Sequence, residues 1–139
     1  MNIKELHFGT MMLQQDDVIL FKLKDDIKLN IDEAIEIVHV TMDIAKNKPF
    51  RSLVDARDIF GSMDSEAKEY VVHHKGINRL TIAQAIVANN IATRLVVSIY
   101  IGFNKSSHPI RMFSDIDEAR AWLLQQFHIE VNPSKELLE

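Results

Sequence analysis

Apolar and polar residues near the start of the chain alternate with a period of two, which is typical of a β-strand. In the run VILFKLK, the side chains of Ile19, Phe21 and Leu23 fall on one face of such a strand. The preceding run, residues 3–14, is also strand-like, and a polar turn at residues 14–17 joins the two. The chain therefore opens with a predicted antiparallel hairpin.

Farther along, segments with helical spacing alternate with short, continuous apolar runs that are typical of buried strands. The predicted order of elements is ββαβαβαβα, an α/β sandwich with a mixed sheet that is mainly parallel beyond the hairpin. We expect one domain over residues 1–128 and a C-terminal tail over residues 129–139. The expected helices span residues 30–48, 65–75, 91–103 and 114–127, and the expected strands span residues 50–56, 80–88 and 110–113.

Local signals define the ends of these helices. Asn30 is a favourable N-cap, and Glu33, three residues later, is its capping-box partner. We expect Gly76 to end the second helix and Ser114 to cap the last one. Trp122 shares the apolar stripe of the last helix, so its ring is expected to be buried against the sheet.

Two short motifs point to a family. A strand ending in LVDAR is followed by a loop with MDSEA and then a helix, and the chain closes with IRMFSDIDEARAWL. In element order and in these motifs, residues 18–127 resemble the SpoIIAA-like or STAS-type domains, which include small bacterial proteins grouped with the SEC14-like lipid-binding fold. The resemblance implies the same α/β fold.

The same resemblance makes Ser65 a candidate phosphosite. In the anti-sigma-factor antagonists of this superfamily, a strand ending in Asp precedes an Asp-Ser pair, and a partner kinase phosphorylates the serine. Asp55 matches the strand-end residue, and Asp64 with Ser65 matches the pair. The chain continues with EAKEY, where the antagonists carry small residues and glycines. Its close is more similar to an uncharacterised SpoIIAA-like branch, which implies no settled activity.

From the residues alone, Ser65 belongs to the start of a helix. The helix terminus favours a phosphate, but Asp64 and Glu66 on either side would repel it. These opposing effects nearly balance, so we expect a mainly structural role for Ser65.

Polar residues follow the buried strand at residues 50–56. Asp55, Arg57 and Asp58 lie where a parallel strand ends, which is the place where open α/β sheets bind ligands. The cluster either holds a polar ligand or forms ion pairs that order the loop, and we favour the ion pairs. Asn104 and Lys105, in a polar loop farther along, are further candidate ligand-binding residues.

Composition narrows the chemistry. The 139 residues include no cysteine, which excludes disulfides, thiolate catalysis and cysteine-bound metals. The six histidines lack metal-ligand spacing, and no phosphate-binding glycine loop or nucleophile motif is visible. We therefore predict no metal site and no cofactor, and the sequence leaves enzyme activity undecided.

The same composition bears on partners and location. A formal net charge of −4 argues against nucleic acid as a partner. No apolar run approaches the roughly 20 residues of a membrane helix, so no integral membrane segment is expected. Because the first residues lack the basic and apolar regions of a signal peptide, we expect a cytoplasmic location.

The segment Ile91–Phe103 is apolar nearly all round, which is unusual for a helix with one solvent-exposed face. We expect the row of residues that begins at Ile91 to face the sheet, which leaves Val96, Tyr100 and Phe103 on the other side. These three residues either form an exposed apolar patch or are covered by a neighbouring helix or by the first strand. The leading hypothesis is a non-catalytic cytoplasmic binding or regulatory module that forms a homodimer through this patch or binds a protein partner. The alternative is a small carrier of lipids or other apolar ligands, with the same helix as one wall of a pocket.

Overall fold

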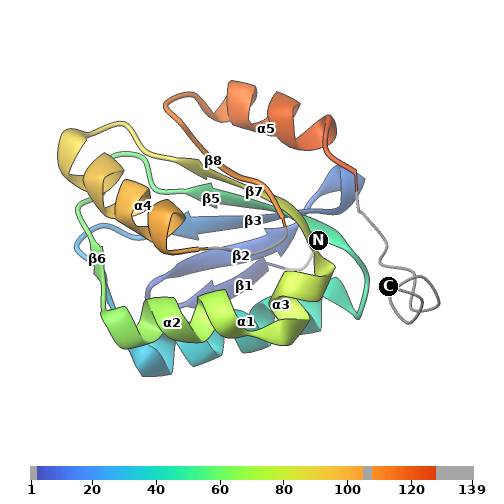
Figure 1. Ribbon diagram of the computed structural model, residues 1–139, viewed down its shortest axis with the longest axis horizontal. Coiled ribbons are helices and arrows are strands. Elements are labelled where there is room, and N and C mark those ends of the chain that lie inside the picture. Colours follow the sequence, from blue (N-terminus) through green and yellow to red (C-terminus); the bar gives the residue numbers. More distant parts are fainter. Residues whose placement is uncertain (1–2, 105–107, 128–139) are drawn as a thin grey trace, which may run out of the picture.

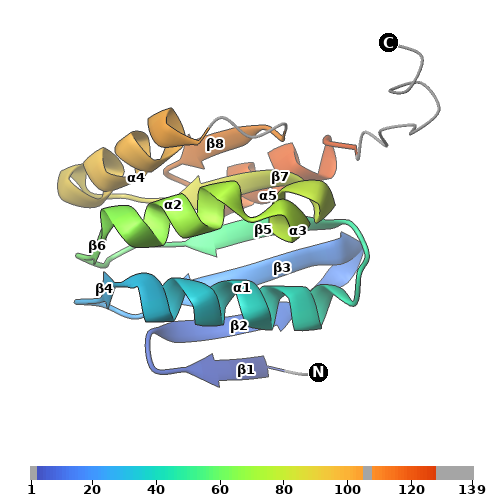
Figure 2. The ribbon, with the colours of Figure 1, turned by 60° about the horizontal axis from the view of Figure 1, so that its bottom comes forward.

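The computed structural model describes residues 3–104 and 108–127. A six-stranded sheet runs through the molecule in the order β1-β2-β3-β5-β7-β8, and Figure 2 shows these strands stacked from β1 at the bottom to β8 at the top. β1, β2 and β3 pair antiparallel, and every later neighbour pairs parallel. The strands are β1 (Ile3–Leu6), β2 (Gly9–Leu13), β3 (Val18–Leu23), β5 (Phe50–Asp55), β7 (Thr81–Val87) and β8 (Ile110–Phe113).

Helices cover both faces of this sheet. α1 to α4 lie on one side, here called the front face, and α5 lies on the other side, the back face (Figures 1 and 2). The predicted sandwich with its mainly parallel sheet is confirmed. The helices are α1 (Ile31–Ala45), α2 (Ser65–His73), α3 (Lys75–Leu80), α4 (Ile91–Phe103) and α5 (Ile116–Leu124).

Strand alternation sends neighbouring residues of one strand to opposite faces. In β5, Leu53 packs on the back face and Val54 packs on the front face. The back-face core is small and dense, because Ala83 and Ala85 of β7 let α5 approach closely and bury Leu123 completely.

A second, two-stranded sheet joins two loops at the carboxyl ends of the central strands. β4 (Lys28–Leu29) pairs in parallel with β6 (Ser62–Met63). The Ser62 N–H donates to the Ile27 carbonyl at 3.0 Å, and the Asp64 N–H donates to the Leu29 carbonyl at 2.9 Å. A short 3₁₀ turn, Gln15–Asp17, connects β2 and β3.

One arginine fastens distant parts of the chain together. The guanidinium of Arg51 donates to three backbone carbonyls: Asp16 at 2.8 Å, Leu123 at 2.9 Å and Gln126 at 2.8 Å. The end of α5 is thereby held against the turn between β2 and β3.

The helix ends agree only in part with the sequence. The capping box of α1 is confirmed: the Glu33 N–H donates to Asn30 Oδ1 at 3.1 Å, and the Asn30 N–H donates to Glu33 Oε1 at 3.3 Å. Ser114 does not cap α5. Asp115 does so, because its carboxylate accepts from the N–H groups of Asp117 and Glu118.

The expected second helix is broken into α2 and α3. His74 stands at the break, where its Nδ1 accepts from the Ile77 N–H at 3.1 Å and caps α3. Gly76 therefore lies inside α3, and the prediction that it ends the second helix is wrong.

The opening hairpin is also more divided than its pattern suggested, because its first run forms both β1 and β2. Gly9 begins β2 at a close approach to β3, where a Cβ would collide with the backbone carbonyl of Lys22. No other residue fits there without moving that strand.

The ring of Trp122 is only half-buried, so the prediction of full burial is wrong. It packs against Phe113, with 5.7 Å between the ring centroids, while the neighbouring Leu123 occupies the core. The tail expected at residues 129–139 lies outside the described residues. Within the described part of the chain, no helix is long and apolar enough to cross a membrane.

Candidate functional site

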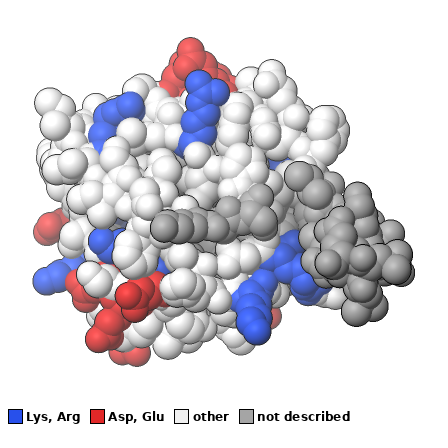
Figure 3. Space-filling view, viewed as in Figure 1, with Lys and Arg blue, Asp and Glu red and all other residues white. Residues whose placement is uncertain are grey.

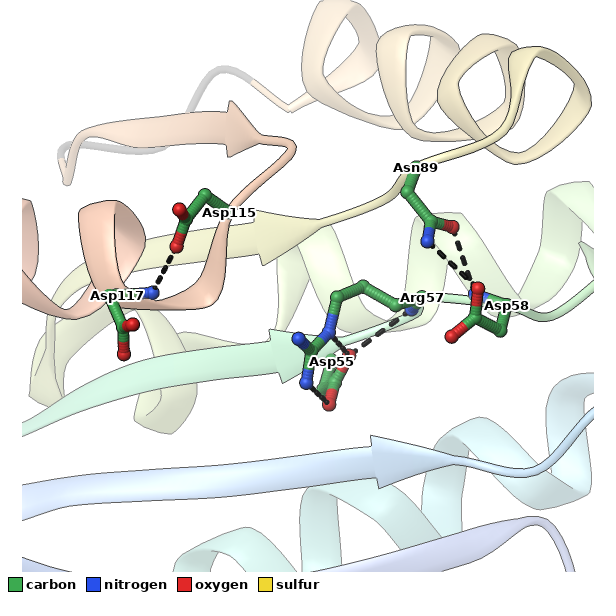
Figure 4. A network of polar contacts seen from close by, with 6 residues as sticks. All are labelled: Asp55, Arg57, Asp58, Asn89, Asp115 and Asp117. Atoms are coloured by element: carbon green, nitrogen blue, oxygen red, sulfur yellow. Dashed lines mark hydrogen bonds and ion pairs between the residues drawn. The ribbon is translucent and has the colours of Figure 1, made fainter.

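The strand-end residues predicted from the sequence do meet, and they form an ion pair (Figure 4). Asp55 ends β5 and is only 5% exposed. Arg57 Nε donates to Asp55 Oδ1 and Nη2 donates to Oδ2, both at 2.9 Å, and the Arg57 backbone N–H donates to Oδ1 at 3.1 Å. Both carboxylate oxygens are therefore engaged by one residue.

This geometry decides the charge of Asp55. Burial alone would raise its pKa, but the hydrogen bonds from Arg57, together with the charges of Arg57 and Lys22, outweigh burial and lower the pKa. The hydrogen bond to Asp55 also raises the pKa of Arg57. The pair stays ionised at neutral pH and lacks the poised pKa that a catalytic acid or base needs.

Asp58 belongs to the same loop but has a different partner. Its backbone N–H donates to Asn89 Oδ1, and Asn89 Nδ2 donates to Asp58 Oδ1, each at 2.9 Å (Figure 4). Asn89 follows β7, so these two bonds join the loops after β5 and β7. The cluster orders the strand ends, and its use as a ligand site stays a prediction.

Asn104 is not part of this cluster. α4 runs back across the sheet from the carboxyl end of β7 to the start of β8, so Asn104 at its C-terminus lies at the opposite end of the strands. Lys105 lies outside the described residues. The structure therefore does not combine all five candidate ligand residues into one site.

Ser65 is the first residue of α2 and is exposed, as the sequence predicted. Asp64 occupies the N-cap position, but its side chain makes no capping hydrogen bond. The helix start is confirmed, and the possibility of phosphorylation at Ser65 stays a prediction.

A cavity of about 160 Å³ lies on the front face between the sheet, α1, α2 and α4, and α4 forms one wall, as the alternative hypothesis from the sequence expected. Its walls are almost entirely apolar. The strands contribute Phe21, Val54 and Ile86, α2 contributes Val71, and the β4–β6 sheet closes one end. The lining residues are Phe21, Leu23, Ile27, Leu29, Ile37, Val54, Ala56, Ile59, Gly61, Ser62, Met63, Lys68, Val71, Gln84, Ile86, Thr93, Val96, Val97 and Tyr100.

α4 faces this cavity with the side that we expected to be exposed. Val96 and Tyr100 line the cavity, so their assignment to an exposed interface patch is wrong. The outward row is instead Ile91, 88% exposed, Leu95, 62%, and Ile99, 52%. Phe103, at 44%, continues that row and is exposed as expected.

Two polar contacts fix this rotation of the helix. The Thr93 hydroxyl donates to the Ile59 carbonyl at 2.7 Å and is buried, which turns that side of α4 inward. Arg94 Nη1 donates to the Ala88 carbonyl at 2.9 Å and to Ser114 Oγ at 2.8 Å. Thr93 was the signal available in the sequence, as a small polar residue in an otherwise apolar helix.

A smaller cavity of about 60 Å³ adjoins the first one and shares Gln84 and Tyr100 with it. Burial raises the pKa of the Tyr100 hydroxyl, against the effect of a hydrogen bond with the Asn104 side chain. Burial lowers the pKa of His108, which also lines this space, to about 4. Both side chains are therefore neutral at physiological pH. Among the described residues, no three His, Asp or Glu side chains gather in a way that would hold a metal ion.

The surface over α4 is largely uncharged, whereas charged side chains of both signs gather near the start of α2 (Figure 3). The molecule thus presents an apolar helix outside, an apolar cavity inside, and a charged rim at one end of α2.

Comparisons with known proteins place the chain in a family. The sequence model of the family described as "Domain of unknown function (DUF7793)" matches residues 11–127. The chain belongs to this family. The matched part of the DUF7793 domain runs from β2 to just beyond α5 and includes every wall of the cavity.

A solved structure shares the fold of this DUF7793 domain. It is an uncharacterised protein of the DUF3478 family, with a SpoIIAA-like fold, from Shewanella loihica PV-4. The two chains are 16% identical, the match covers 88% of this chain and 92% of the other, and the TM-score is 0.57. The SpoIIAA-like fold inferred from the sequence motifs is therefore confirmed. No curated protein matches the sequence.

Proposed function

We propose that this DUF7793 domain is a non-catalytic, cytoplasmic binding module that holds a small apolar molecule in the cavity between the sheet and α1, α2 and α4. The apolar cavity of about 160 Å³ carries the proposal. A concave, mainly apolar space with a few polar groups in its lining is the usual form of a small-molecule site.

The energy of such a space favours an occupant. Because the cavity is only partly enclosed, its apolar walls face water when no ligand is bound. A ligand that fills the space recovers lost dispersion contacts and removes its own apolar surface from water.

The volume indicates the size of the ligand. Drug-sized ligands occupy pockets of roughly 300–1,000 Å³, whereas an engineered apolar cavity of about 150 Å³ binds benzene. The DUF7793 cavity is of the second kind, so it suits a compact ring or a short chain and is too small for a whole phospholipid. The closed Asp55–Arg57 pair supports a role in binding and not in catalysis.

Filling the cavity from within tests this proposal. Val96→Phe places a ring in the space, whereas Leu95→Phe adds the same ring on the outward side of the same helix. Titration of benzene into isotope-labelled protein, followed by NMR, should shift the resonances of Val54, Ile86 and Val97 in the wild type and in Leu95→Phe. Val96→Phe should lose most of this response.

The proposal fails if benzene leaves these resonances unchanged in the wild type, or if both variants respond equally. Native mass spectrometry of the protein purified without detergent adds a direct measurement, because a retained natural ligand would appear as extra mass.

Self-association through α4 is a second candidate, supported by the outward row of Ile91, Leu95, Ile99 and Phe103. Large exposed apolar side chains in one line are typical of an interface, and a second copy of the chain presents the same row. Leu95→Glu should convert a dimer into a folded monomer in sedimentation velocity, and Leu95→Met, which keeps the apolar surface, should not. A wild type that is monomeric at high micromolar concentration would exclude this candidate.

A further inference from the structure

Among the residues that the structure describes, Lys68 is the one charged residue that lines the apolar cavity. It lies in the first turns of α2, is half-buried and contributes to the cavity wall. The remainder of the lining is apolar apart from a few neutral polar side chains.

Within residues 3–104 and 108–127, no carboxylate lines the cavity to balance this ammonium. The ion pairs among the described residues are His7–Glu33, His39–Asp43 and Arg57–Asp55, and Lys68 takes part in none of them. Asp64 and Glu66 stand near Lys68 in sequence, but neither lies within ion-pairing distance of it. The ammonium has a positive charge and three hydrogen-bond donors, and it forms no ion pair with any described residue.

Two of the neutral polar groups in the lining are already engaged. Gln84 Nε2 donates to Ser52 Oγ at 3.2 Å, and the Thr93 hydroxyl donates to the Ile59 carbonyl at 2.7 Å. Ser62, which is exposed on β6, adds a hydroxyl to the same lining as Lys68. Polar recognition within this cavity therefore falls mainly to Lys68.

We propose that the ligand of this cavity is a small amphipathic anion: an apolar tail of about six carbons fills the space, as benzene fills a cavity of similar volume, and a carboxylate pairs with Lys68. This inference rests on the proposed function, since it names the chemical class of the molecule held there. It also supplies a partner for a cation that forms no ion pair in the described part of the chain.

Three probes with the same apolar tail and different polar heads distinguish a cavity that binds any small apolar molecule from one that selects anions. Hexanoate, 1-hexanol and hexylammonium are titrated into the wild-type protein near neutral pH and at low salt, and binding is followed by NMR at cavity residues. We expect hexanoate to bind about tenfold more tightly than hexanol, and hexylammonium to bind most weakly. Added salt should reduce the advantage of hexanoate, because Lys68 is partly exposed.

Two lysine variants test the assignment to Lys68. Lys68→Met keeps a stem of similar length and removes the charge, so the preference for hexanoate should disappear while hexanol binds as before. Lys75→Met removes the same charge from an exposed position on α3 that does not line the cavity, and it should leave the preference intact.

The failures are distinguishable. If none of the probes binds, the proposed function is wrong and this inference falls with it. If hexanol binds and hexanoate binds no more tightly, the cavity binds apolar molecules but does not select anions. Equal loss of preference in both lysine variants would indicate a general charge effect and would overturn the role of Lys68.

Discussion

The two faces of the sheet are built from alternate residues of the same strands, yet they are packed differently. On the back face, Leu53, Ala83 and Ala85 meet Ala119 and Leu123 of α5, and all five are fully buried. On the front face, α2 and α4 stand apart and leave the 160 Å³ cavity above Val54 and Ile86. The back face is thus packed throughout, whereas the front face combines a packed core under α1 and α3 with a space for a ligand between α2 and α4.

Replacing the key residue of the back face should have the largest effect. Leu123→Ala removes a side chain with no exposed surface and should lower the free energy of unfolding by about 3–5 kcal/mol. Leu124→Ala, on the same helix but 42% exposed, should cost less than about 1 kcal/mol. Urea denaturation measures both. Similar losses in the two variants would show that the back face is not the tightly packed side.

The strand-end ion pair should have a smaller effect. Arg57→Met leaves the carboxylate of Asp55 buried without its partner and should destabilise the fold by about 1–3 kcal/mol, since Arg57 itself is partly exposed. NMR titration should also show that the pKa of Asp55 rises in this variant. An unchanged pKa would contradict the attribution of its lowered value to Arg57.

The front face should show its own dependence on pH. The unfolded His108 takes up a proton below about pH 6.5, whereas the folded one does so only near its pKa of about 4. The unfolded state therefore binds more protons between these values, and stability should fall as the pH drops from about 6.5 towards 4. In urea denaturation against pH, His108→Gln should flatten this slope. Because the pKa of Asp55 is lowered from its ordinary value of 3.8 in the folded state, the stability that its ionised form contributes is lost only at lower pH, below that value.

The smallest effect should be that of Ser65→Ala. Its hydroxyl is exposed at the start of α2, and the N-cap position belongs to Asp64, so the change in unfolding free energy should be under about 1 kcal/mol. A thermal melt measures it. Stoichiometric phosphate on Ser65, with loss of a partner in Ser65→Asp, would contradict a mainly structural role.

The sheet could be predicted from the sequence, whereas the arrangement of the helix α4 on its front face could not. The alternation in β3 and the apolar runs of β5 and β7 predicted the sheet correctly, because burial on both faces leaves a continuous pattern in sequence. The ion pair between Asp55 and Arg57 could be anticipated, since both residues follow one strand end.

The orientation of α4 could not be predicted in the same way. When nearly every position of a helix is apolar, hydrophobic periodicity gives no direction, and Val96 and Leu95 look equivalent. The hydrogen bond from Thr93 to Ile59 sets the rotation, and it joins residues 34 positions apart in sequence. The cavity depends on that rotation and on the gap between α2 and α4, so neither its volume nor the place of Lys68 followed from the sequence.

Arg51 has a consequence for how the protein is made. Its three hydrogen bonds join β5 to the turn after β2 and to the end of α5, so they need residues as far apart as Asp16 and Gln126. During synthesis, the whole segment from Asp16 to Gln126 must leave the ribosome before this guanidinium can form all three hydrogen bonds. Until then, the nascent sheet exposes the apolar surface that α5 later covers. A chaperone can bind this surface during that time.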